Sequence, residues 1–429
     1  MSLPPGPRYP RTLCTLGWVL RPGAFMDRCR RRYGDTFTLR IANEGTWVML
    51  SDPADVKQVF TGDPAVFHAG EGNAILSPVL GHHSVLLLDE GEHLAQRKLM
   101  LPSFHGERMQ RYGELMASVA REEIARWPAG RPFPLRPSMQ AVTLEVIMRA
   151  VFGMREGARL ERLRALLGDL LDVFGDARRM LPVILLGPER VHHHPLHRRL
   201  LRPVDELVYA EIADRRADPA LAERDDILSL LLQARHEDGQ PMRDEELRDE
   251  LMTLLIAGHE TTATALSWAV ERLVRHPAQL ARLHDEVAAG EDVYLDAVAK
   301  ETLRLRPVVA IVVRKLTRPV TIGGHDLPAG VTVAPSIYLV HRRPDVYPDP
   351  LSFRPERFLE RPAGTYTWIP FGGGVRRCLG ASFALFEFRT VLAEMVRGAR
   401  LAPSRRQAER IRRRAITMVP EHEAEVVAA

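Results

Sequence analysis

The sequence predicts a mainly α-helical fold with small β-sheets, of the α+β class. Apolar residues recur at three- and four-residue intervals over most of residues 53–274, which indicates helices. Short alternating runs near both ends of the chain indicate strands. No internal repeat or clear linker divides the chain, so we expect residues 1–429 to form one domain.

The elements follow in order from the N-terminus. A helix is expected over residues 17–34, and the runs 36–41 and 46–50 predict a hairpin whose turn is Asn43-Glu44-Gly45. The further expected helices span residues 107–127, 135–152, 159–174, 197–216, 225–234 and 244–276. The last is the longest: acidic residues crowd its start, and Pro277 stops it.

The character of the chain changes after Pro307. Residues 308–313, 320–322, 331–335 and 416–419 are β-like, and a final helix is expected over residues 379–397. Between them lies a proline-rich stretch, residues 342–374, without a regular pattern. Irregular segments of this length are uncommon in a compact domain unless they serve a function, which draws attention to the segment that follows.

Composition excludes several classes of protein. The formal net charge is only +4, which does not indicate nucleic-acid binding. Only four of the 59 basic residues are Lys, and such a bias toward Arg is typical of a GC-rich bacterial genome. Three cysteines at unrelated spacings do not form a disulfide framework. No apolar run has the length of a membrane span and no signal peptide is evident, so we expect a soluble cytoplasmic protein.

The segment Phe371-Gly-Gly-Gly-Val-Arg-Arg-Cys378-Leu-Gly380 predicts a metal-binding loop. Glycines let a backbone fold tightly beneath a flat cofactor, and backbone N–H groups can stabilise a sulfur anion. The start of a helix and the nearby Arg376 favour thiolate over thiol. A lone Cys is more often a small buried hydrophobe, but such a Cys needs no glycine run. We therefore expect Cys378 to bind a haem iron, since a thiolate ligand favours O–O cleavage.

The longest predicted helix carries residues suited to the opposite side of such a cofactor. Ala257 and Gly258 remove side-chain bulk, so a flat ring or O₂ could approach. Thr261 can relax the helix by bonding back to a carbonyl. Glu260 and Thr261 together offer an acid and a hydroxyl for moving protons. Alone, this segment would indicate only close helix packing, but beside the Cys378 loop the functional interpretation is favoured.

A third motif, Glu301-Thr-Leu-Arg304, places an acid and a base on one helix face. Arg357 follows in Pro355-Glu-Arg357-Phe358. A network of these three charged residues would attach the irregular stretch to a helix and hold the Cys378 loop.

Together the four segments resemble the signature motifs of the cytochrome P450 family, in that family's order and spacing. The resemblance covers essentially the whole chain and implies a cytochrome P450 fold with the long helix over haem b, iron protoporphyrin IX. It implies that Cys378 is the proximal ligand with Phe371 and Gly380 beside it, that Ala257 lies against the haem, that Thr261 activates oxygen, and that Glu260 relays protons. It also implies that the haem propionates bind His93, Arg97, Arg314 and Arg376.

The same resemblance places a substrate pocket over the haem, lined by residues 67–88, residues 170–186, Ala257 and strongly apolar segments. The pocket residues that we expect are Leu86, Leu87, Leu88, Val308, Val309, Ile311, Val312, Ile416 and Thr417. Such a pocket suits a fatty acid, terpene, steroid or similar hydrophobic molecule. Apolar stretches are, however, more often simply core.

We therefore expect a monomeric monooxygenase without a fused reductase, which receives electrons from a separate ferredoxin or flavodoxin and its NAD(P)H reductase. The resemblance also indicates no membrane anchor, because the proline-rich lead-in begins almost at the N-terminus. A patch of Arg97, Lys98, Arg108, Arg111, Arg376 and Arg377 could steer an acidic donor, or could be only an Arg-rich surface. The alternatives are an H₂O₂-dependent peroxygenase, in which the acid–hydroxyl pair is usually missing, and a non-catalytic carrier or sensor.

Overall fold

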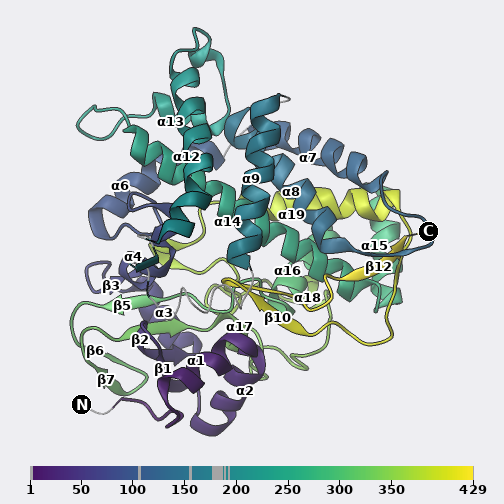
Figure 1. The fold of residues 1–429 in the computed structure, drawn as a ribbon. Helices are drawn as coiled ribbons and strands as arrows, with labels where there is room; N and C mark the ends of the chain where they lie inside the picture. Colours follow the sequence, from purple (N-terminus) through teal and green to yellow (C-terminus); the bar gives the residue numbers. More distant parts are fainter. Residues whose placement is uncertain are drawn as a thin grey trace.

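The computed structural model describes residues 3–104, 108–153, 157–175, 187, 190–191 and 194–428. It is mainly helical with small sheets, as the sequence predicts (Figure 1). The α-helices are α1 (Arg11–Leu20), α2 (Pro22–Tyr33), α3 (Pro53–Thr61), α4 (Ala69–Gly72), α5 (Ser77–Leu80), α6 (Glu90–Met100), α7 (Arg108–Ile124), α8 (Leu135–Phe152), α9 (Ala158–Gly175), α12 (Pro195–Arg216), α13 (Ile227–Gln233), α14 (Asp244–Leu273), α15 (Pro277–Ala289), α16 (Val293–Leu305), α17 (Ile337–Val340), α18 (Arg357–Glu360) and α19 (Ala381–Gly398).

The described residues also contain four small sheets. The largest has the strand order β1-β2-β8-β5-β3, in which only β2 and β8 run parallel. The other sheets have the orders β4-β12-β9, β10-β11 and β6-β7. The strands are β1 (Thr36–Ile41), β2 (Gly45–Leu50), β3 (Phe67–His68), β4 (Pro132–Pro134), β5 (Arg314–Leu316), β6 (Val320–Ile322), β7 (His325–Leu327), β8 (Thr332–Pro335), β9 (Leu401–Pro403), β10 (Ile411–Arg414), β11 (Thr417–Pro420) and β12 (Glu425–Ala428).

The helix α14 organises the larger part of the core. Its 30 residues span about 45 Å at 1.5 Å per residue. It lies among α8, α19 and α16, and the indole N–H of Trp268 donates a hydrogen bond of 2.8 Å to the carbonyl of Met418 in β11. A second core joins α1 and α2 to the strands at the lower left of Figure 1. The candidate site lies where these two parts meet.

Three predicted elements differ from the structure. The helix expected over residues 17–34 is two helices, because Pro22 disfavours helical geometry at Arg21 and begins α2. The longest helix ends at Leu273, earlier than expected. Residues 308–313 are not a strand: they share backbone hydrogen bonds with two separate segments, residues 335–338 and Met418, so no ladder forms. The hairpin of β1 and β2 is confirmed.

Candidate active site around Cys378

Cys378 lies in a tight loop between a short 3₁₀ helix (Gly374–Arg376) and α19. Its backbone N–H donates a hydrogen bond of 2.9 Å to the carbonyl of Phe371, and the N–H of Gly380 donates to its sulfur. Burial raises the pKa of the thiol, while the Gly380 N–H and the charges of Arg97 and Arg377 lower it. The sulfur is enclosed by protein and yet open on one side. Burial outweighs these contacts, so the pKa of the free thiol lies above its ordinary value. The Gly380 N–H and the two cations would stabilise a thiolate once an electrophile such as a metal ion binds the sulfur.

Two glycines of the run make close contact with α3. A Cβ at Gly374 would lie 1.9 Å from the carbonyl oxygen of Phe60 in α3, and one at Gly373 would lie 2.1 Å from the Phe60 ring. The glycines therefore let the loop pack against α3. Gly374 also has a φ of +66°, which side chains disfavour. This close packing against Phe60 is a role that the sequence did not predict.

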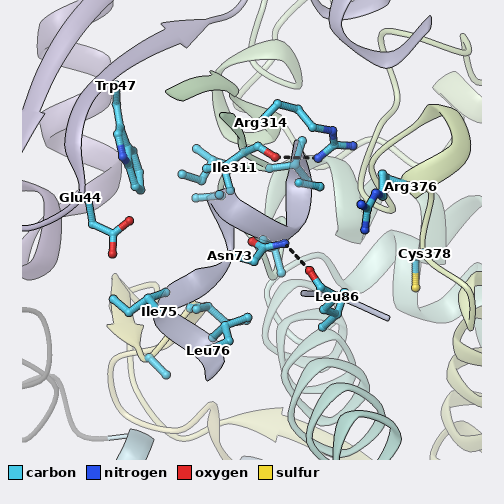
Figure 2. Close-up of a pocket in the computed structure, with 18 of the residues that line it drawn as sticks. Glu44, Trp47, Asn73, Ile75, Leu76, Leu86, Ile311, Arg314, Arg376 and Cys378 are labelled. Carbon is cyan, nitrogen blue, oxygen red and sulfur yellow. Dashed lines mark hydrogen bonds between the residues drawn. The ribbon is translucent and has the colours of Figure 1, made fainter. Parts of the chain in front are cut away.

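A cavity of about 320 Å³ opens at Cys378 (Figure 2). Its volume lies in the range of small-molecule sites, and its lining is mostly apolar. It brings together residues that are distant in sequence. The predicted site residues that line it are Leu86, His93, Arg97, Val309, Ile311, Val312, Arg314, Arg376, Cys378 and Ile416.

The side chains of His93, Arg97, Arg314 and Arg376 all line this cavity. Burial, followed by the charges of Arg376, Arg97 and Arg314, lowers the pKa of His93 to about 3, so this imidazole is neutral. Burial and the neighbouring Arg376 lower the pKa of Arg314 to about 10. Positive charges that repel one another in this way favour the binding of a ligand with more than one negative charge.

Arg376 also supports the loop that borders the cavity. Its guanidinium pairs with Asp89 at 2.5 Å, donates to the carbonyl of Val85 at 3.2 Å, and donates to the carbonyl of Leu88. The carboxylate of Asp89 in turn accepts hydrogen bonds from the N–H groups of Gly70 and Glu71. Arg376 therefore attaches the Cys378 loop to the segment between α3 and α6.

The middle of α14 is unusual for a buried helix. Ala257 is exposed and Gly258 and Thr261 are half-buried, although most of α14 is buried. The hydroxyl of Thr261 donates a hydrogen bond of 2.6 Å to the carbonyl of Ala257, which confirms the predicted backward bond. Gly258 has a different role from the one expected, because a Cβ there would lie 2.9 Å from Ile147 of α8. Gly258 therefore lets two helices approach, and Ala257 leaves an exposed stretch of α14.

The carboxylate of Glu260 is directed toward α8. It accepts hydrogen bonds from Arg136 at 3.1 Å and from Gln140 at 2.7 Å, and Arg414 lies 3.6 Å away. Arg136 also pairs with Glu423. Sequence reasoning missed this network, since nothing in the local pattern of Arg136 connects it with a helix so far along the chain.

The structure brings Glu301, Arg304 and Arg357 together, with the first two fully buried. Arg304 donates to Glu301 at 2.6 and 2.8 Å, and Arg357 donates to Glu301 at 3.2 Å. The remaining N–H groups of Arg304 bind the carbonyls of His341, Pro350 and Ser352. The irregular stretch before Cys378 is thus attached to α16. Nearby, the ring of Phe371 packs edge-on against Trp368.

Other expected pocket residues lie elsewhere. Leu87, Leu88, Ala257, Val308 and Thr417 are not among the residues of the described chain that line the cavity. Of the expected segment 170–186, residues 176–186 lie outside the described part. Sequence reasoning missed Glu44, Trp47 and Arg413, which line the far end of the cavity. The sequence predicts only a turn at Glu44, and nothing in the sequence distinguishes Arg413 from the other arginines.

Comparison with known proteins is consistent across the whole chain. The family model described as Cytochrome P450 matches residues 4–427. The chain is 48% identical to cytochrome P450 135B1 of Mycobacterium tuberculosis, over 99% of this chain and 91% of that protein. It is 41% identical to cytochrome P450 135A1 of the same species, over 98% of this chain and 94% of that protein.

Solved structures agree on the fold. The retinoic-acid-bound cyanobacterial CYP120A1 superposes with a TM-score of 0.84 at 24% identity, covering 100% of both chains. The haem domain of cytochrome P450DA gives the same TM-score and identity, over 100% of this chain and 97% of that one. Across the described ranges, every helix is too short or too polar to cross a membrane.

Proposed function

Because the chain belongs to the cytochrome P450 family, which uses haem, we propose that it is a haem-thiolate monooxygenase whose iron is held by Cys378. The observation that carries this proposal is the single cavity that joins the Cys378 sulfur, a cationic cluster and an apolar lining. Bound haem would supply oxygen activation, because a thiolate ligand favours O–O cleavage. One oxygen atom enters the substrate and the other leaves as water.

The residues around the cavity fit iron protoporphyrin IX. Haem carries two propionates, and Arg97, Arg314 and Arg376 supply the positive charge that two carboxylates need. The neutral His93 can donate one hydrogen bond to the same edge. Gly380 stabilises the thiolate through its N–H, and Phe371 packs beside the loop. The network of Glu301, Arg304 and Arg357 keeps that loop in place.

Thr261 and Glu260 manage protons in this proposal. The single proton of the Thr261 hydroxyl bonds the Ala257 carbonyl, and the hydroxyl can pass this proton on by giving up that bond while its oxygen accepts another proton. Glu260 is the adjacent acid, and Arg136 and Gln140 hold its carboxylate. An intact acid–hydroxyl pair favours the use of O₂ over the H₂O₂-dependent alternative. A non-catalytic carrier would have no need of Thr261.

The substrate is a hydrophobic small molecule such as a fatty acid, terpene or steroid, because Leu86, Val309, Ile311, Val312 and Ile416 make most of the lining that we assign to it. Electrons come from a separate ferredoxin or flavodoxin and its NAD(P)H reductase, in the cytoplasm, and residues 1–429 act as one monomeric haem domain. Lys98 pairs with Glu237, and Arg111 pairs with Asp225. Because these two cations already have acidic partners, Arg377 is the better candidate for binding the electron donor.

Turnover with ¹⁸O₂ tests the proposal. Hydrophobic compounds are first screened for a shift of the haem from low to high spin. A compound that gives the shift should then yield a product with one ¹⁸O atom, in a reaction that needs NAD(P)H and an electron donor. Equal turnover with H₂O₂ alone would instead support the peroxygenase, and a spin shift without any product would support the carrier.

A further inference from the structure

The end of the cavity away from Cys378 is polar, and no predicted role accounts for it. Glu44 and Trp47 stand across the cavity from Cys378, with the apolar Ile75, Leu76 and Ile311 between them (Figure 2). Arg413 of β10 and Trp18 of α1 line the same end. The cavity therefore has two polar ends: the cationic cluster near the sulfur, and a second group built from the β1–β2 turn and β10.

The hydrogen-bond donors of Arg413 are only partly paired at this end of the cavity. Its Nε donates to the carbonyl of Ala415 at 2.7 Å, Nη1 lies 3.5 Å from the carbonyl of Trp18, and the guanidinium lies 4.9 Å from the Trp18 ring centre. Within the described residues, Nη2 has no hydrogen-bond partner and no carboxylate forms an ion pair with Arg413. Burial lowers the pKa of Arg413 to about 10, although Glu44 opposes this.

Glu44 is the complementary group. In the part of the chain that the structure describes, its carboxylate has no hydrogen-bond or ion-pair partner, although it lines the cavity. Burial raises its pKa, while the charges of Arg413 and Lys315 lower it. Glu44 and Arg413 thus influence each other across the cavity end without contact. Two partly buried groups of opposite charge remain open to a ligand.

A negatively charged ligand group would be attracted by Arg413 and repelled by Glu44. A positively charged group would be attracted by Glu44 and repelled by Arg413. An apolar group would leave both desolvated without a partner. An uncharged hydroxyl or amide can satisfy both, because it accepts one hydrogen bond and donates another.

We propose that this end of the cavity is a head-group subsite, in which Glu44 accepts a hydrogen bond from, and Arg413 donates one to, the uncharged hydroxyl or amide end of an otherwise apolar substrate. Trp47 and Trp18 flank this head group. The subsite rests on the proposed function, because it completes the same cavity. It narrows the substrate class to elongated apolar molecules with a neutral polar end, such as long-chain alcohols, primary amides or hydroxylated terpenes.

A matched ligand series tests the subsite in the haem-loaded protein. Decanamide, decanoate, decyltrimethylammonium and decane share a chain and differ in their head groups. Dissociation constants come from spin-state titration, and from calorimetry for ligands that give no spectral change. Wild type should bind decanamide at least about tenfold more tightly than the other three ligands. Equal binding of decane and decanamide would overturn the subsite.

Charge variants separate the two residues. Glu44→Gln removes a charge at constant shape, so it should favour decanoate over decyltrimethylammonium by about tenfold relative to wild type. Arg413→Gln should shift the ratio in the opposite direction. The exposed Glu421→Gln and Arg410→Gln are matched controls on the neighbouring hairpin and should leave the ratio unchanged. Since Glu44 is half-buried and unpaired with any described residue, Glu44→Gln decides the matter even if Arg413→Gln fails to fold.

Different results would overturn the head-group subsite and the proposed haem-thiolate function. An unchanged ligand ratio in Glu44→Gln, with a normal thiolate-haem spectrum, would overturn the head-group subsite alone. Loss of the thiolate-haem spectrum in wild type would overturn the proposed function, whatever the calorimetric preference.

Discussion

Arg136 and Glu260 form an ion pair of 3.1 Å that joins α8 to the middle of α14. Arg136 is buried, and its second acid, Glu423, lies near the C-terminal strand β12. The acid beside Thr261 is therefore held from the side of α8 and the C-terminal segment. The sequence predicts a proton relay at Glu260 but does not predict this ion pair with Arg136.

Glu260→Gln keeps the shape of the side chain and its capacity to accept from Arg136, but it removes the acid. If Glu260 passes protons to Thr261, product formation should fall by about 100-fold, and the solvent deuterium isotope effect on turnover should rise. Glu423→Gln is the matched control, since it removes the other carboxylate on Arg136. Equal turnover in wild type and Glu260→Gln would remove Glu260 from the relay.

Thr261→Ala removes the hydroxyl in the middle of α14 and its 2.6 Å bond to the Ala257 carbonyl. Electrons from NAD(P)H should then appear as H₂O₂ or water instead of product, because proton transfer is no longer directed. Thr261→Ser keeps the hydroxyl and should restore most of the coupling. The measurement is the ratio of product to NAD(P)H consumed, with the haem spectrum unchanged. Full coupling in Thr261→Ala would contradict the role of this hydroxyl.

Arg304→Met tests the network behind the Cys378 loop. It would leave the fully buried Glu301 with Arg357 as its remaining guanidinium partner, and breaking a buried ion pair costs about 3–5 kcal/mol. Denaturant unfolding of the haem-loaded protein should show that loss, together with faster release of haem. Arg389→Met breaks an ion pair with Asp296 nearer the surface and should cost less than about 1 kcal/mol. Similar losses in both variants would argue against the network.

His341 predicts a pH dependence of stability away from the site. It is fully buried, its Nε2 accepts a hydrogen bond of 2.8 Å from the Ile369 N–H, and burial with the charge of Arg304 lowers its pKa from 6.5 to about 3. Between these values the unfolded chain binds more protons than the folded one. Stability should therefore fall as the pH drops below 6.5, by about 1.4 kcal/mol per pH unit from this residue.

Denaturant unfolding between pH 4 and pH 7 measures that slope, with His341→Gln as the test and the half-buried His325→Gln as the control. The slope should flatten in His341→Gln alone. An unchanged slope in His341→Gln would show that other groups carry the acid sensitivity.

Local patterns predicted much of this molecule. Leu135–Phe152 is a helix with the predicted bounds, because Pro134 precedes its first residue and Gly153, in the left-handed conformation, ends it. The Cys378 loop and the pairing of Glu301 with Arg304 also follow from short spacings. Contacts between distant segments could not be predicted: Phe60 explains the glycine run, and Ile147 explains Gly258.

The polar end of the cavity was missed for the same reason. Glu44 lies in a hairpin turn and Arg413 lies near the end of the chain. Only the packing of α1 and the large sheet against the C-terminal hairpin brings them to one cavity. Residues 308–313 show the converse: their apolar pattern suits a strand, but their backbone partners lie in two separate segments.

The spectrum of the reduced CO complex tests the central claim most directly. Wild type should show the strongly red-shifted Soret band of thiolate-ligated haem, and Cys378→Ala should lose it. Cys14→Ala and Cys29→Ala, which change the two buried cysteines of the N-terminal helices, should keep it. A wild-type spectrum without the red shift, or a red shift that persists in Cys378→Ala, would contradict Cys378 as the haem ligand.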